Sequence, residues 1–191
     1  MTLADEFLRT KERRIIYKGQ EVWREHRFPI ANKQRVRVTI ESYNSDWGGL
    51  GRYHYFEGVG LMIDKQIRVN DLSTGFLMLW PYSPPWEQLQ PPYYEVHEIE
   101  EGWYYFERPR KWISLWLREP YKPIELLCLT RDGHIHVWNV WCKEVRAIDG
   151  LYNCAGMIVE EIESGFRYHC NDGYPDEDFN DIVFTIERCE E

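Results

Sequence analysis

Apolar and polar residues alternate along much of this 191-residue chain. In the stretch RVRVTIESY, residues 35–43, Val36, Val38 and Ile40 share one face, and the residues between them are polar or charged. A period of two is typical of a β-strand with one buried face. Residues 182–187 alternate in the same way and predict a closing strand. We expect one core to contain Val36, Val38, Ile40, Ile182, Phe184 and Ile186.

Short turns separate further runs of this kind. A D-G pair lies between residues 124–130 and 134–142, which is a strong hairpin signal. The complete set is about ten strands, and it favours an all-β fold, a β-sandwich or jelly roll, over residues 33–191 as a single globular unit. The other strand candidates are 53–63, 66–70, 75–80, 93–99, 103–106, 111–118, 157–162 and 166–170.

The N-terminal segment has a different pattern. Residues 2–16 place apolar side chains on one side of a helix and charges on the other, and Thr2 is suited to cap it. Residues 17–32 are mixed in character. We therefore expect residues 1–32 to form a short N-terminal helix and arm ahead of the β-sandwich domain.

Composition narrows the function classes. A net charge of −9 argues against nucleic-acid binding, which needs clustered Lys and Arg. There is no apolar run long enough for a membrane helix, and the N-terminus lacks a signal-peptide core. Five cysteines, an odd number with no CxxC pair, favour free thiols in a reducing compartment. We expect a cytoplasmic protein that contacts neither nucleic acid nor membrane.

Aromatic residues are numerous, with 9 Trp, 13 Tyr and 8 Phe. Rings fit pleated sheets, so most of them are accounted for by a core. Those in loops or at strand ends are candidates for a face that contacts a glycan or a protein partner. The ligand-binding candidates are Trp47, Trp80, Trp86 and Tyr94.

An acidic loop, residues 171–181, precedes the closing strand. Carboxylate and amide oxygens are the ligands that Ca²⁺ prefers. The spacing partly copies a helix-loop-helix calcium loop, but Asp181 replaces the required glycine and too few residues follow for a second helix. That motif is excluded.

The string DEDFNDIVF, residues 176–184, resembles the D-x-D-[FY]-N-D signature of bacterial secreted, adhesin-like β-sandwich domains of unknown function. The resemblance spans about fifteen residues. It implies a calcium ion held by Asp176, Asp178, Asn180 and Asp181. The alternative is that these residues only form a turn, because Asp and Asn readily bond their own backbone.

Other catalytic signals are weak. His134 and His136 lie on the same face of a strand, as in one family of jelly-roll metal sites, but the following carboxylate has the wrong spacing. The chain has no G-x-S-x-G, P-loop or G-x-G-x-x-G motif. Catalytic residues therefore stay unknown.

Three functional hypotheses follow. The first is a non-catalytic binding module with a calcium-stabilised acidic loop and an aromatic face for a glycan or protein. The second is a small enzyme, a cyclase, isomerase or hydrolase, with a carboxylate acid–base in an aromatic-lined pocket. The third is a structural or assembly protein. The sequence leaves the oligomeric state open.

Overall fold

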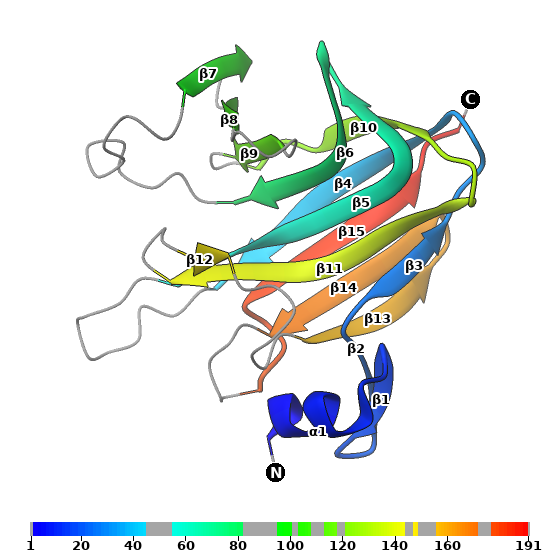
Figure 1. The fold of residues 1–191 in the computed structure, drawn as a ribbon, viewed down its shortest axis with the longest axis vertical. Helices are drawn as coiled ribbons and strands as arrows, with labels where there is room; N and C mark the ends of the chain where they lie inside the picture. The colour runs from blue at the N-terminus through cyan, green and yellow to red at the C-terminus, as the bar shows by residue number, and fades with distance from the viewer. Residues whose placement is uncertain are drawn as a thin grey trace.

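The computed structural model describes residues 2–44, 55–81, 95–100, 103–107, 113–117, 121–143, 147–148, 156–171 and 177–190. Within them lie one α-helix and fifteen strands (Figure 1). Their bounds are α1 Leu3–Thr10, β1 Arg14–Tyr17, β2 Gln20–Trp23, β3 His26–Pro29, β4 Gln34–Tyr43, β5 Tyr55–Val69, β6 Leu72–Trp80, β7 Glu95–Glu100, β8 Trp103–Glu107, β9 Ile113–Leu117, β10 Ile124–Leu129, β11 His134–Lys143, β12 Ala147–Ile148, β13 Gly156–Ile162, β14 Gly165–Asn171 and β15 Ile182–Arg188.

The described strands form one connected sheet in the order β1-β2-β13-β14-β15-β4-β10-β5-β6-β9-β8-β7, and β11 pairs with β5, β3 and β12. Neighbours are antiparallel except β6 and β9, which are parallel. The sheet curls strongly, so that β5 and β11 cover the layer of β4, β15 and β14 (Figure 1). The all-β prediction is confirmed. The two-layer sandwich is not shown, because the described strands belong to a single curled sheet.

Long strand β5 makes this curl possible. Its first half pairs with β11 and its second half pairs with β10, while β6 runs along its other edge. The register with β6 shifts between Met62 and Ile67. Such a bulge bends a strand and increases its twist. The two strands predicted at 53–63 and 66–70 are therefore one bent strand.

The predicted core is confirmed. Val36, Ile182, Phe184 and Ile186 are 0% exposed, and Val38 and Ile40 are 1% and 5% exposed. In the β4–β15 pair, Ile186 lies opposite Val38 and Phe184 opposite Ile40. The apolar side chains that alternation places on one face of each strand therefore meet inside the curl.

The N-terminal helix is shorter than predicted. Thr2 caps α1, and its side chain and that of Asp5 form a reciprocal capping box. The helix ends at Thr10, and its C-cap Lys11 has a φ of 57°. Residues 14–16, expected to be helical, belong to strand β1 instead, because Ile15 and Tyr17 alternate with exposed residues and pair with β2.

The arm predicted at residues 17–32 also contributes strands to the sheet. Strand β2 meets β13 where Trp23 pairs with Met157, and β3 pairs with β11 over four residues. Helix α1 lies beside this first hairpin (Figure 1). Gly156 of β13 leaves room for it, because a Cβ there would lie 2.9 Å from Leu3 and 2.8 Å from Val22.

Candidate functional site

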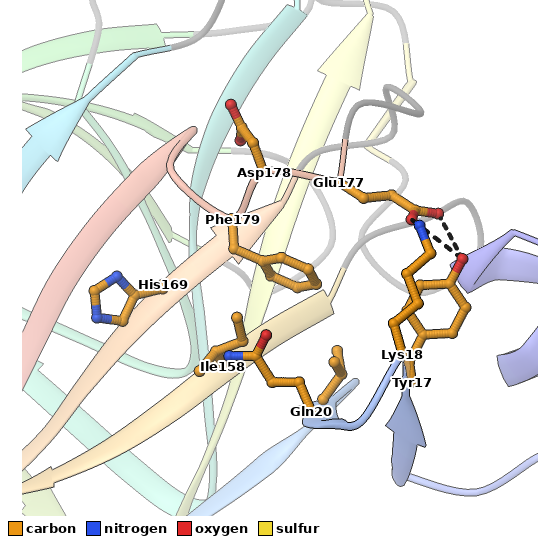
Figure 2. A pocket seen from close by; sticks show the side chains of 9 residues that line it. Tyr17, Lys18, Gln20, Ile158, His169, Glu177, Asp178 and Phe179 are labelled. Atoms are coloured by element: carbon orange, nitrogen blue, oxygen red, sulfur yellow. Dashed lines mark hydrogen bonds and ion pairs between the residues drawn. The ribbon is translucent and has the colours of Figure 1, made fainter.

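A pocket of about 400 Å³ opens between the β1–β2 hairpin, strands β13 and β14, and residues 177–179 ahead of β15 (Figure 2). We call it the hairpin pocket. The N-terminal hairpin and a region near the C-terminus, which are distant in sequence, build it together. Its lining residues are Tyr17, Lys18, Gln20, Val22, Ile158, His169, Glu177, Asp178 and Phe179.

Glu177 is the carboxylate that joins these parts. Its Oε1 accepts hydrogen bonds from the backbone N–H of Leu3 at 3.1 Å and from the hydroxyl of Tyr17 at 2.9 Å. Its Oε2 lies 2.6 Å from the ammonium nitrogen of Lys18. The Glu177 side chain is only 9% exposed, whereas that of Lys18 is 71% exposed. The acidic loop thus binds the start of α1 and the first hairpin.

These contacts set the protonation states. Burial acts to raise the pKa of Glu177, but the hydrogen bonds from Lys18, the Leu3 N–H and Tyr17 outweigh it and lower that pKa. The hydrogen bond to Glu177 raises the pKa of Lys18. Burial, and then the hydrogen bond and charge of Glu177, raise the pKa of Tyr17. Glu177 and Lys18 therefore form a charged pair near neutral pH.

Unusual backbone conformations concentrate around this pocket. Lys18 and Gly19 have φ of 49° and 82° and form the two-residue turn between Tyr17 and Gln20. Such turns favour Asn-Gly or Asp-Gly. Glu177 and Phe179 have φ of 55° and 56°. Three of the six non-glycine residues with positive φ in the described part of the chain thus line one pocket, and such strain tends to cluster at functional sites.

The pocket combines an apolar floor with a polar rim. Val22 and Phe179 are buried at 1% and 9% exposure, and Ile158 packs with them. Gln20 and the exposed Asp178 belong to the rim. In Figure 2 the ring of Phe179 lies between Ile158 and the Lys18–Glu177 pair, while the Asp178 carboxylate points away from that ring.

The residues predicted to hold calcium are only partly described, since Asp176 lies outside the described residues. Asp178 is exposed, and its Oδ1 accepts from the backbone N–H of Asn180 at 3.1 Å, as the turn-only alternative expects. Asp181 is 3% exposed, and its backbone bonds to Cys170 and Asn44. The described residues hold no group of three or more His, Cys, Asp or Glu placed to bind an ion. The calcium site stays a prediction.

Of the four aromatic residues predicted to bind a ligand, one lies within the described residues. Trp47, Trp86 and Tyr94 lie outside the described residues. Trp80 is 2% exposed and packs against β5, where a Cβ on Gly58 would come within 2.8 Å of its ring. In this conformation Trp80 offers little surface to a ligand, and its binding role stays a prediction.

The two histidines of β11 have local partners. Nδ1 of His136 lies 2.5 Å from Oε1 of Glu25, and Nδ1 of His134 lies 2.7 Å from the carbonyl oxygen of Asp132. His136 has a side-chain exposure of 15%. Hydrogen bonding within the described chain therefore accounts for both.

A buried polar cluster was not predicted. Glu57 on β5 is 0% exposed, and its Oε1 lies 3.3 Å from Nδ2 of Asn139 on β11. The same Nδ2 donates to the carbonyl oxygen of Asn171 at 2.7 Å, whereas Oδ1 of Asn139 has no hydrogen-bond partner among the described residues. The signal was present in the sequence, because a period of two places Glu57 on the same face as the core residues Val59 and Leu61.

Cys170 lies near this cluster. Burial raises the pKa of its thiol well above the usual value, and the charges of Glu57 and Asp181 add to that effect. Cys128, Cys170 and Cys189 are free thiols. A neutral, fully buried thiol is a poor nucleophile. The cluster offers the enzyme hypothesis a buried carboxylate but no activated cysteine.

Comparison with family models, curated proteins and solved structures gives no match for this chain. The described residues include no helix long and apolar enough to cross a membrane.

Proposed function

We propose that this protein is a non-catalytic interaction module whose hairpin pocket receives a side chain from a partner polypeptide. The observation that supports this proposal most is the pocket itself. Separate chain segments build it. The left-handed backbone conformations of Lys18, Glu177 and Phe179 fix its shape. Pre-formed pockets with an apolar floor and few polar groups are typical of binding sites.

A protein side chain suits the described pocket better than a glycan does. Sugars are usually held against exposed faces of aromatic rings, and Phe179 is only 9% exposed. A floor of Val22, Ile158 and Phe179 matches an aliphatic stem instead. The rim of Gln20 and Asp178 supplies polar groups for the end of such a side chain.

The sandwich or jelly-roll class belongs to the same proposal. The curled sheet encloses its core between β5 and β11 on one side and β4 and β15 on the other (Figure 1). Two layers of a sandwich would enclose a core in the same manner.

Selection from a displayed peptide library tests the function. Gln20→Trp fills the pocket from its rim, and Arg27→Trp adds the same ring at an exposed position on β3 as a control. We expect the selected peptides to bind the wild type and Arg27→Trp equally well. They should not bind Gln20→Trp. Selection that yields no binding peptide, or peptides that bind both variants equally, would refute the proposal.

A further inference from the structure

The hairpin pocket already contains a bound ammonium group. The nitrogen of Lys18 lies 2.6 Å from Oε2 of Glu177 and 5.2 Å from the centre of the Tyr17 ring. A carboxylate at hydrogen-bond distance and an aromatic ring within about 6 Å are what protein sites for ammonium ions provide. The ammonium group of Lys18 thus occupies a position that suits an ammonium ligand.

The position of Lys18 in the chain is unfavourable for a turn. It has a φ of 49° at the first central position of a two-residue hairpin loop, where Asn or Asp is favoured. A lysine offers the turn no advantage, because its side chain neither bonds the local backbone nor relieves the left-handed conformation. Its contribution is the ammonium placed beside Glu177.

The two partners of this ion pair differ in how firmly they are held. Glu177 is 9% exposed and also binds the Leu3 N–H and the Tyr17 hydroxyl, so its carboxylate keeps its place without Lys18. Lys18 is 71% exposed and projects from a turn. An ion pair with an exposed partner contributes little in general, so an incoming ammonium can replace the exposed Lys18 at small cost.

Charge favours such a ligand. The pocket lining contains one lysine, Lys18, and two carboxylates, Glu177 and Asp178. The whole chain carries a net charge of −9. A cation is therefore attracted both locally and at longer range.

We infer that the hairpin pocket recognises a lysine side chain of a partner polypeptide, whose ammonium replaces that of Lys18 on Glu177 while its methylene stem lies against Val22, Ile158 and Phe179. This inference rests on the proposed function and names its ligand class. Lys18 becomes a built-in competitor that keeps the carboxylate paired until a partner arrives.

Binding of three small probes, followed by backbone amide chemical shifts, tests this inference. The probes are the Nα-acetyl, N-methylamide derivatives of lysine, norleucine and glutamate, which share a backbone and differ at the end of the side chain. We expect only the lysine probe to shift the amides of Lys18–Gln20 and Glu177–Phe179 in a saturable way. Equal binding of the norleucine probe, or preferred binding of the glutamate probe, would overturn the lysine assignment.

Lys18→Asn gives the sharpest discrimination, because Asn suits the turn and removes the competitor. Affinity for the lysine probe should rise about two- to fivefold, which corresponds to freeing a site held by an exposed ion pair. Lys33→Asn, which removes the same charge from another left-handed turn position, should leave the affinity unchanged. A loss of affinity in Lys18→Asn would mean that Lys18 itself binds the ligand and would overturn the inference.

Glu177→Gln should abolish binding of the lysine probe while its amide spectrum stays that of a folded protein. Unchanged binding there would also overturn the inference. The two proposals fail separately. If norleucine or glutamate probes bind the pocket as well as lysine does, only the lysine assignment fails. If none of the three binds and the peptide library yields no pocket-dependent sequence, the interaction function fails too.

Discussion

The strand core and the hairpin pocket are built by different means. In the core, buried apolar side chains alternate along β4 and β15, and the two strands pair in a register that shifts once, between Val183 and Phe184. In the pocket, turn residues with left-handed backbone bring one carboxylate to three donors from the other end of the chain. Burial of apolar surface therefore stabilises the core. In the pocket, a charged group and strained backbone are combined instead, a combination that is common at functional sites.

The largest effect is expected in the core. Phe184 is 0% exposed, and its ring stacks on Tyr168 with centroids 4.7 Å apart. Phe184→Ala should lower the free energy of unfolding by about 3–5 kcal/mol, measured by urea denaturation. Ile16→Ala, at a position that is 67% exposed on β1, should change it by less than about 0.5 kcal/mol. Equal effects of the two substitutions would contradict the division into core and periphery.

The difference between the strand core and the hairpin pocket also explains which features can be predicted from the sequence. A period of two was enough for the core of β4 and β15, because each residue's face depends only on its neighbours in the strand. Strand β1 was mistaken for the end of a helix, since four residues are too few to distinguish the two periods. The groups that donate hydrogen bonds to Glu177 lie 159 to 174 residues away in the sequence. The local pattern of residues carries no information over such a separation. The sequence singles out the acidic loop only as a calcium candidate, which stays a prediction, and it gives no signal for the contact partners of Glu177.

Calcium would add to the stability of the acidic loop beside the hairpin pocket. If the loop that contains Asp178 holds Ca²⁺, the ion should stabilise the protein by about 2.7 kcal/mol at a hundredfold excess over Kd. Thermal melting with calcium and with a chelator measures this, and Asp178→Ala should remove the response. A wild-type melt that ignores both reagents would leave the loop as a turn, with Asp178 needed for its bond to the Asn180 N–H.

Titration separates the two regions. On the core side, His26 is 7% exposed, and Nδ1 lies 3.0 Å from the hydroxyl oxygen of Tyr168. Burial lowers the pKa of His26 to about 4, with the charge of Glu21 opposing this effect. The unfolded chain therefore takes up a proton first, so stability should fall as the pH drops from about 6.5 to about 4. His26→Gln should flatten that part of a stability–pH curve, and an unchanged slope would contradict the assignment.

Glu177 should act in a more acidic window. Because its pKa is lowered in the folded protein, its contribution is complete above the unfolded value near 4.5 and is lost as the pH falls through the folded pKa. Glu177→Gln should cost about 1.5–3 kcal/mol at pH 7, the size of hydrogen bonds to a charged group, and this cost should shrink below pH 4.5. Denaturation at both pH values measures it, with the exposed Glu12→Gln as a control that should change little. A cost that persists in acid would mean that shape, not charge, is what Glu177 contributes.

The smallest effect on stability is expected at Lys18. Lys18→Asn relieves the turn at φ 49° but removes the ion pair with Glu177, and these two changes oppose each other. Lys33 offers the matched case, because its φ is 68° and no ion pair is present for it among the described residues. Lys33→Asn should raise the melting temperature by about 2–4 °C, roughly the effect of 1 kcal/mol in a domain of this size. Lys18→Asn should raise it by less, and the difference between the two measures the ion pair. If Lys18→Asn stabilises the protein as much as Lys33→Asn, the ion pair contributes nothing to folding.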